Sequence, residues 1–317
     1  MKKRIISVLL ATVFALSVIG CGTKDTKEQD AYRQYGITCM ESGKYEDAVK
    51  AFQNALGESI GHIGEKELDI CFYKAKAQAL NGKTKDALAT YDAIIKYNKD
   101  ARAYYLRGDL YMDMGEEKKG KADFESAVQH GKKNYEIYIG IYESLSRHEK
   151  KDEGQKYLSA AMEIKGDKPE DELYKGRISY LLGENKDAIS YLEKAKEHKQ
   201  MLASYYLGLA YDANGDSDKA KKCIAEYIKS GVATSYDLYE LGMQEMQDGN
   251  YKNALTYFNS GLELEIVPNK QNLMKSAIAA YEYSGDFDSA KKMMKEYLKA
   301  YPDDEEAKHE NTFLETR

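Results

Sequence analysis

The sequence has only three prolines and no extended run of glycine and serine, the residues that dominate flexible linkers. We therefore expect no long disordered linker within its 317 residues. A basic excess is also absent, because 47 lysines and arginines stand against 53 aspartates and glutamates and give a net charge of −6. A general nucleic-acid binder needs basic residues that displace counterions from phosphates. The composition therefore argues against nucleic acid as a partner.

Several signatures of common catalytic and metal sites are missing as well. The five histidines are scattered, and none stands four residues from another. The sequence contains no HExxH or CxxC motif and no Walker glycine-lysine loop. We therefore predict a protein that is not an enzyme and that has no cofactor and no metal ion. An enzyme or a binder of small solutes, with a site built from residues that carry no signal, is the weaker alternative.

The first twenty residues have the pattern of a secretory signal rather than of a folded segment. Three basic residues at positions 2–4 precede an apolar run from Ile5 to Ile19, which is short for a membrane span. The run ends in Val-Ile-Gly-Cys at positions 18–21, which resembles the lipobox of bacterial lipoproteins. The resemblance implies that residues 1–20 are removed and that Cys21 then carries a diacylglyceryl group. An uncleaved signal anchor is the alternative.

This interpretation places the protein on the extracytoplasmic side of a bacterial cell membrane, anchored by the lipid on Cys21. Residues 21–28 form the expected tether, and seven extended residues reach roughly 25 Å. Removal of residues 1–20 takes away three basic residues, so 44 basic against 53 acidic residues give a charge of −9. Because so acidic a protein suits anionic lipid poorly, we expect the lipid group to supply the membrane contact.

The stretch Tyr205–Tyr227 contains a spacing of small residues and a turn glycine that recurs along most of the chain. Gly208 lies on a first apolar helix pattern, Gly215 in a turn seven residues later, and Ala220 on a second helix pattern. Small residues at such points let two antiparallel helices approach closely. The first-helix marker recurs at spacings of 39, 33, 34, 34, 32, 34 and 36 residues, at Gly36, Ala75, Gly108, Tyr142, Gly176, Gly208, Gly242 and Ile278.

A turn residue follows seven positions after each marker, and it is glycine everywhere except at Glu149. A small residue follows five positions further in all eight units: Ala48, Ala87, Gly120, Gly154, Ala188, Ala220, Ala254 and Ala290. With its period near 34, the chain resembles the tetratricopeptide repeat family over about Gln29–Asp304. The family's tryptophan is absent, and Tyr32, Cys71, Tyr104, Tyr138 and Leu238 stand in its place.

The resemblance implies an all-α fold, a right-handed superhelical solenoid of about eight helix-turn-helix repeats. The solenoid is expected over residues 29–304, with a solvated capping helix at 305–317. The approximate repeats are 29–62, 68–100, 101–134, 135–168, 169–200, 201–234, 235–268 and 271–304.

Three departures from the repeat pattern carry their own expectations. In the fourth repeat Tyr142 replaces the small marker, so we expect a shifted helix with Gly140 as the contact residue. The segment Gly57–Gly64 exceeds the period and is expected to form a protruding loop. The two extra residues around Pro268 predict a small bend between the last two repeats.

The remaining cysteines, Cys39, Cys71 and Cys223, each lie inside a helical repeat pattern. We expect them to be small buried hydrophobic residues. A single disulfide between Cys39 and Cys71 is the alternative, since the compartment outside the membrane permits disulfides.

Side chains with oxygen atoms that could bind calcium stand at every second position, at Asp212, Asn214, Asp216 and Asp218, as at the start of a calcium-binding loop. An EF-hand loop needs glycine at its sixth position and glutamate at its twelfth, where Ser217 and Cys223 stand. We therefore interpret the segment as a turn between two helices, where asparagine, glycine and aspartate are also favoured.

The first helix of each repeat lines a concave groove in this family, and its first, fourth, eighth and eleventh positions tend to face the ligand. Tyrosine and methionine at such positions are typical of protein-binding surfaces. The predicted groove residues are Tyr105, Asp109, Met112, Arg177, Tyr180, Tyr205, Leu209, Tyr236, Tyr239, Met243 and Met246. The same positions also hold Arg102, Glu170, Leu173, Leu202 and Asp212.

An aromatic groove flanked by charges suits an amphipathic helix or an extended segment with apolar anchors. The Lys and Asn set with which chaperone-binding members hold a terminal carboxylate is not visible, because Arg33 and Ile37 stand there. We therefore predict a membrane-tethered, non-enzymatic scaffold that binds a protein or peptide of the cell envelope. The alternative is an assembly or secretion factor that holds clients or cell-wall enzymes.

Packing between helices is the expected role of Tyr104, Tyr111, Tyr211 and Tyr281.

Overall fold

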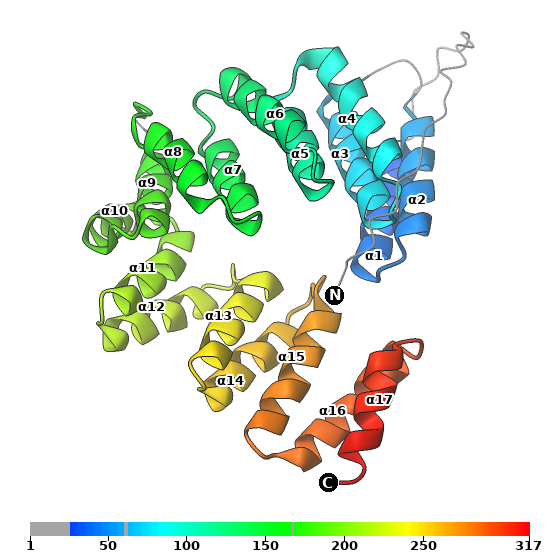
Figure 1. Cartoon of the computed structure of the whole chain (residues 1–317), viewed down its shortest axis with the longest axis vertical. Coiled ribbons are helices and arrows are strands. Elements are labelled where there is room, and N and C mark those ends of the chain that lie inside the picture. Colours follow the sequence, from blue (N-terminus) through cyan, green and yellow to red (C-terminus); the bar gives the residue numbers. More distant parts are fainter. Residues whose placement is uncertain (1–25, 60–62, 167) are drawn as a thin grey trace. The chain divides into compact units, whose positions relative to one another are not determined.

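In a computed structural model, residues 26–59, 63–166 and 168–317 are described, and these ranges form seventeen α-helices without a β-strand. The helices follow one another as antiparallel pairs (Figure 1). The predicted all-α fold of consecutive helix pairs is thereby confirmed. The expected signal peptide, Cys21 and residues 22–25 lie outside the described ranges. Within those ranges, no helix is both long and apolar enough to cross a bilayer.

The helix bounds follow the repeat pattern. They are α1 Thr26–Glu41, α2 Tyr45–Gly57, α3 Glu65–Leu80, α4 Thr84–Asn98, α5 Ala101–Asp113, α6 Glu117–His130, α7 Tyr135–Arg147, α8 Lys151–Met162, α9 Pro169–Leu182, α10 Asn185–Glu197, α11 Leu202–Ala213, α12 Ser217–Lys229, α13 Ser235–Gln247, α14 Tyr251–Leu262, α15 Lys270–Tyr283, α16 Phe287–Ala300 and α17 Glu305–Leu314. The odd-numbered helices α1 to α15 are the first helices of the repeats, and the even-numbered helices are the second.

The turn glycines end seven of the eight first helices by adopting a backbone conformation that other residues rarely take. Gly115 has φ +76°, and the amide that follows it, on Glu116, donates a 2.9 Å hydrogen bond back to the carbonyl of Tyr111. This closure ends α5 and lets α6 begin at Glu117. All seven predicted turn glycines have positive φ: Gly43, Gly82, Gly115, Gly183, Gly215, Gly249 and Gly285.

The marker residues lie where the paired helices cross. A Cβ atom on Gly208 would lie 2.4 Å from Cδ1 of Ile224, and one on Gly108 would lie 3.0 Å from the carbonyl oxygen of Gly120. The predicted close approach of the helices is confirmed. The side chain that fills the space over each marker glycine comes sixteen residues later, at Phe52, Phe124, Leu192, Ile224 and Phe258.

The fourth repeat keeps the common register, and the expectation that Gly140 forms its helix contact is wrong. A Cβ atom on Gly154 of α8 would lie 3.1 Å from Cα of Tyr142, so Tyr142 stands at the crossing. Gly140 instead faces the ring of Tyr105 on α5. Glu149 takes φ +61° in place of the turn glycine. The bulky marker is accommodated because α8 supplies the small residue at the crossing.

The connection between α2 and α3 is the longer one that the sequence predicts. It covers residues 58–64, of which 60–62 lie outside the described ranges. The amide of Gly64 donates to Oε2 of Glu67 at 2.8 Å, which caps the start of α3.

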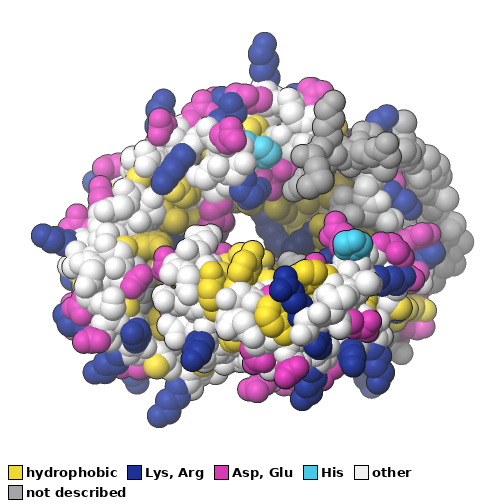
Figure 2. All heavy atoms as spheres, turned by 60° about the horizontal axis from the view of Figure 1, so that its bottom comes forward, with side chains coloured by type: hydrophobic (Ala, Val, Ile, Leu, Met, Phe, Trp, Pro, Cys, Tyr) yellow, Lys and Arg dark blue, Asp and Glu magenta, His cyan; other side chains and the backbone are white. Residues whose placement is uncertain are grey.

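Charged side chains of both signs are interleaved on the face of the molecule in Figure 2. On the second helices, Lys118 and Lys119 of α6 and Lys221 and Lys222 of α12 are exposed. Such side chains are well solvated, and an exposed ion pair such as Lys119–Glu116 contributes little to stability.

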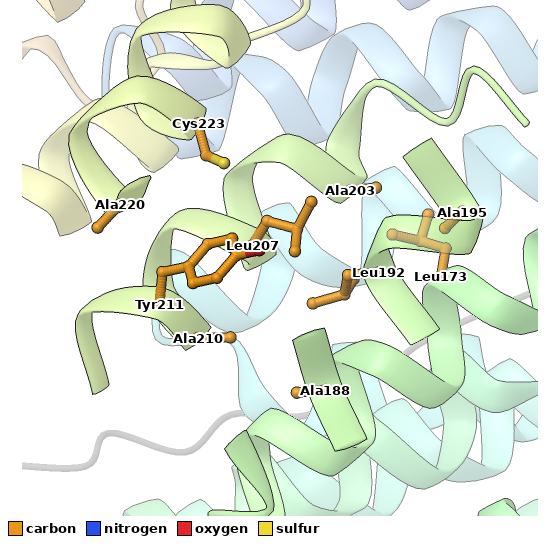
Figure 3. Close-up of a cluster of buried hydrophobic side chains, with 10 residues drawn as sticks. All are labelled: Leu173, Ala188, Leu192, Ala195, Ala203, Leu207, Ala210, Tyr211, Ala220 and Cys223. Atoms are coloured by element: carbon orange, nitrogen blue, oxygen red, sulfur yellow. The ribbon is translucent and has the colours of Figure 1, made fainter. Parts of the chain in front are cut away.

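Two compact units divide the chain, one ending at Glu226 and the other spanning Tyr227–Arg317. The boundary falls within α12. Each unit has its own buried clusters. In the first, Leu173, Leu192 and Leu207 converge from α9, α10 and α11, with the ring of Tyr211 beside Leu207 (Figure 3). In the second, Phe258 and Leu273 form one cluster, and Met294, Tyr297 and Leu314 contribute to another.

The described cysteines are free thiols, and the alternative of a Cys39–Cys71 disulfide is not realised. Cys39 and Cys223 are buried and belong to the hydrophobic clusters, as expected. Cys71 is half-buried, and burial raises the pKa of its thiol. The three side chains therefore pack as small hydrophobic residues.

Candidate functional site

Three first helices of the first unit carry a charged residue at the same position of consecutive repeats. Asp109 on α5, Glu143 on α7 and Arg177 on α9 are separated by 34 residues each, one repeat length. Nη2 of Arg177 lies 2.9 Å from Oε1 of Glu143, and Nη1 lies 3.2 Å from Oε2 of Glu136. One guanidinium thus holds two carboxylates of the neighbouring first helix.

The aspartate of the series pairs with a different partner. Oδ1 of Asp109 lies 2.5 Å from Nη2 of Arg147, which stands near the end of α7. Beside this pair, the phenol of Tyr105 lies over Gly140, where an added Cβ would come within 2.6 Å of the ring. Glycine at 140 therefore lets the tyrosine of α5 seat against the backbone of α7.

Arg177 also connects α9 to α11. Its guanidinium carbon lies 5.4 Å from the ring centroid of Tyr206. One turn further along α9 stands Tyr180, a half-buried residue that packs against the cluster around Leu207. The charged residues are therefore followed along the surface by two aromatic residues, Tyr180 on α9 and Tyr206 on α11.

The electrostatics of these groups follow from partial burial. Burial by itself would lower the pKa of Arg177, but Tyr206, Glu136 and Glu143 more than offset it, so the pKa is raised. Burial raises the pKa of Tyr105, and Asp109 adds to the effect. Burial and then Asp212 raise the pKa of Tyr180. Near neutral pH the arginine is therefore charged and the two phenols are neutral hydrogen-bonding groups.

We call this surface the first-helix face. It lies entirely in the first unit and runs across α5, α7, α9 and α11. Its members are Tyr105, Asp109, Glu136, Glu143, Arg147, Arg177, Tyr180 and the half-buried Leu209.

Two predicted groove residues of the first unit are corrected by their burial. Met112 is 4% exposed and packs against Gly120, so it belongs to the α5–α6 core. Tyr205 is 8% exposed, with its ring edge-on to Tyr206 at 5.1 Å. Neither side chain offers area to a partner. Leu173, at another of the groove positions, is buried in the same way.

The four predicted groove residues of the second unit all lie on α13. Tyr236 is 54% exposed. Tyr239, Met243 and Met246 are half-buried and pack against the cluster around Phe258. The ring centroid of Tyr239 lies 6.1 Å from that of Phe258. These residues form a separate, largely packed surface on the second unit.

Tyrosines that the register assigns to helix packing have that role. Tyr211 is buried, and its hydroxyl donates to Oε1 of Glu193 at 2.6 Å. The ring of Tyr104 stacks on His130 at 5.3 Å. The hydroxyl of Tyr281 accepts a 3.4 Å hydrogen bond from Asn259.

Glu136, Glu143 and Arg147 belong to the first-helix face but are missing from the sequence prediction. The signal for the two glutamates was present, because they stand 34 residues after the groove positions Arg102 and Asp109. The bulky marker Tyr142 predicts a shifted helix in the fourth repeat, and such a shift would move both glutamates away from these positions. Arg147 lies outside the four positions, and only its long side chain brings it to Asp109.

The acidic segment after α11 serves as a turn between two helices. Asn214 caps the C-terminus of α11, and Gly215 has φ +85°. The amide of Asp216 donates to Tyr211 at 2.8 Å, and its carboxylate accepts from the amide of Lys219 at 3.4 Å. Across the described residues, no group of three or more His, Cys, Asp or Glu side chains is arranged to hold a metal ion.

Comparisons with known proteins agree with this architecture. Family models described as tetratricopeptide repeat match residues 101–129, 202–230 and 271–304. These segments coincide with the pairs α5–α6, α11–α12 and α15–α16. A comparison with curated proteins gives no match.

Solved structures with similar folds have low sequence identity to this chain. A tetratricopeptide repeat protein from Parabacteroides merdae is 12% identical with a TM-score of 0.47, over 80% of this chain and 99% of that one. PilW, a widely conserved type IV pilus biogenesis factor, is 17% identical with a TM-score of 0.43, over 66% and 97%. Yeast Tom70 is 15% identical with a TM-score of 0.50, over 86% of this chain and 58% of Tom70. Tetratricopeptide repeats are therefore recognised in three parts of the chain, within an all-α array of consecutive helix pairs.

Proposed function

We propose that this protein is a non-enzymatic scaffold, anchored by a lipid on Cys21 to the extracytoplasmic side of a bacterial membrane, and that its first-helix face binds a segment of an envelope protein. Tetratricopeptide repeats generally bind protein partners, and this chain contains them. The observation that carries the choice of surface is the row of charges across α5, α7 and α9, next to half-buried Tyr180 and Leu209.

The two glutamates of this face can bind a partner in addition to Arg177. The side chains of Glu136 and Glu143 are 53% and 46% exposed although both contact Arg177. Because about half of each glutamate side chain stays accessible, a basic group of a partner can bind these carboxylates while Arg177, whose side chain is 16% exposed, keeps its contacts. Half-buried Tyr180 lies one turn after Arg177 on α9, and half-buried Leu209 lies one turn after Tyr206 on α11, so both supply apolar area. The face suits a helix or extended segment that combines apolar anchors with basic residues.

The face is tested by a double variant, Tyr180→Ala with Leu209→Ala. The matched control is Ile189→Ala with Tyr191→Ala, which removes an aromatic and an aliphatic half-buried side chain from the second helix α10. Partners are identified by crosslinking and mass spectrometry in intact cells, with circular dichroism to verify folding. We expect the first variant to lose a partner that the control keeps. Retention of every partner by the first variant would contradict the proposed face.

The tether is tested separately through Cys21→Ala. If Cys21 carries the lipid, the substitution leaves a precursor without lipid, which has a different mass and loses metabolic labelling with a fatty acid. Unchanged mass and labelling would show that the anchor is not at this cysteine. The outcome is independent of the first-helix face, because the two regions share no residue.

A further inference from the structure

The last helix of the second unit, α17, places an acidic side chain against an acidic side chain of α15. Glu310 of α17 lies close enough to Glu282, near the end of α15, to form a side-chain hydrogen bond with it. Oε1 of Glu282 is buried and has no hydrogen-bond partner. Both residues are half-buried. We call Glu282 and Glu310 the carboxyl pair. Two ionised carboxylates at this distance repel each other, and burial strengthens the repulsion.

No basic side chain neutralises the carboxyl pair among the described residues, because neither of its members belongs to an ion pair there. The two lysines of α15 and α17 that do form ion pairs have other partners. Lys275 of α15 lies 2.7 Å from Oδ2 of Asp304 and 3.9 Å from Oε2 of Glu306. Lys308 of α17 lies 2.7 Å from Oε1 of Glu305. These contacts are all made at the beginning of α17.

The other groups around the carboxyl pair are neutral or turned to aromatic rings. On either side of Glu282, Tyr281 accepts a hydrogen bond from Asn259 of α14, and Tyr283 stacks on the ring of Tyr251 at 5.3 Å. Beyond Glu310, the guanidinium carbon of Arg317 lies 5.8 and 4.8 Å from the ring centroids of Phe287 on α16 and Phe313. His309, next to Glu310 on α17, is exposed. Among charged groups, Glu310 is therefore the one that acts on Glu282.

The two ends of α17 respond to pH in opposite directions. Burial, and after it the charge of Glu310, raises the pKa of Glu282. At the start of the helix, hydrogen bonds from Lys275 and Tyr297 lower the pKa of Asp304. A carboxyl group with a raised pKa stabilises the fold at and below its ordinary value of about 4.3, and this stabilisation is lost as the pH rises through the folded value. The carboxyl pair therefore favours docking of α17 in mild acid.

The part of α17 after Glu310 covers apolar side chains at the end of the second unit. Leu314 is fully buried in a cluster with Ile278 of α15 and Met294 of α16. A terminal helix that is held by few contacts opens locally more readily than the body of a domain. Opening of this half of α17 would expose Ile278 and Met294.

We infer that the carboxyl pair makes α17 a pH-sensitive cap of the second unit. With one proton shared between Glu282 and Glu310, the C-terminal half of the helix docks on α15 and α16. With both groups ionised near neutral pH, it opens more often and uncovers the apolar cluster. The docked state thus binds more protons than the open state, and the protons come from the solvent. The carboxyl pair shares no residue with the first-helix face.

Hydrogen exchange of the full chain between pH 5 and pH 8, corrected for the intrinsic exchange rates, tests the inference. Protection of the α17 amides, relative to those of α13, should fall by about threefold or more as the pH rises. Glu282→Gln keeps a hydrogen-bonding side chain without the charge and should hold α17 at its acidic level of protection throughout. Glu282→Lys, which attracts Glu310, should do the same. The control is Glu296→Gln at an exposed residue of α16, which should behave as the native chain.

Two results would overturn the inference. One is protection of α17 that does not change with pH in the native chain, or that changes equally in Glu282→Gln. The other comes from carbon NMR of glutamate carboxyl groups, in which the Glu282 signal is assigned by its absence from Glu282→Gln. A Glu282 signal that titrates at or below the ordinary value would show that the two groups do not share a proton.

Discussion

The Nη2 atom of Arg177 lies 2.9 Å from Oε1 of Glu143, the residue that holds the same position one repeat earlier. A repeat array brings equivalent positions close together, so residues of the same charge sign at that position would repel each other. Here the sign changes between α7 and α9, and the neighbouring positions attract. The ion pair between Arg177 and Glu143 therefore fixes the positions of these two side chains in the absence of a partner.

Replacing Arg177 with glutamine should destabilise the first unit by about 1–2 kcal/mol, because it removes contacts with Glu136, Glu143 and Tyr206. Urea denaturation followed by circular dichroism measures the change. In the double variant with Glu143→Gln, the loss should be smaller than the sum of the two single losses. Additive losses would show that the pair is not coupled. Lys50→Gln, which breaks only exposed pairs with Glu46 and Asp47, should leave the unfolding curve unchanged.

Asp123→Asn should cost about 2–4 kcal/mol of folding stability. Two nitrogens of Arg107 bind the carboxylate of Asp123 at 2.6 and 2.7 Å, and the aspartate side chain is only 9% exposed. Asp92, which contacts the same arginine, is 56% exposed. Asp92→Asn is therefore the matched control and should cost less than about 1 kcal/mol. Equal losses for the two substitutions would refute the role assigned to burial.

Gly120→Ala should destabilise the α5–α6 pair by about 1–3 kcal/mol. Its new methyl group would lie 2.9 Å from the carbonyl oxygen of Gly108, and the backbone there cannot turn aside as a side chain can. Gly57→Ala is the control, because an added Cβ there meets nothing within 4 Å at the end of α2. That control should be neutral or slightly stabilising, since alanine favours helix. Thermal unfolding of both variants measures the difference, and a stable Gly120→Ala protein would contradict the close crossing.

Glu149→Gly should stabilise the protein by about 0.5–1 kcal/mol. Glu149 has φ +61°, a strained value for residues with a Cβ, at the position where other repeats carry glycine. Glu163→Gly makes the same exchange at the end of α8, where φ is −76°, and should destabilise or leave stability unchanged. If both substitutions shift the unfolding midpoint in the same direction, the left-handed strain is not the cause.

Asp304→Asn should loosen α17 at neutral pH and have little effect in acid. Hydrogen bonds from Lys275 and Tyr297 hold the pKa of Asp304 well below its ordinary value. The bonds measure 2.7 Å from Nζ of Lys275 and 2.5 Å from the hydroxyl of Tyr297. Because the pKa is lowered on folding, the stabilisation is complete above about pH 5 and is lost as the pH falls below about 4 toward the folded value.

Hydrogen exchange of the α17 amides, measured at several pH values, tests this dependence. The difference in protection between the native chain and Asp304→Asn should narrow as the pH falls. The adjacent Asp303→Asn, at an exposed residue, should leave protection unchanged at every pH. A difference that stays constant with pH would mean that the charge of Asp304 does not hold the helix.

The sequence by itself determined the helix pairs and their turns. A glycine with positive φ and a small residue at a helix crossing are local requirements, and both repeat with a period near 34 that can be read without any structure. Register also indicated equivalent positions of the first helices, at which Asp109, Glu143 and Arg177 follow one another at 34-residue spacing.

Only the tertiary structure decided how deep each of those positions lies and which charges meet. Met112 and Tyr205 share the predicted register with Asp109 and Leu209 but are buried, because neighbouring helices close over them. Arg147 reaches Asp109 from outside the register through the length of its side chain. Periodicity gives the direction of a side chain from its helix axis, whereas exposure and pairing depend on the distance to the next helix, which is set by packing across residues far apart in the sequence.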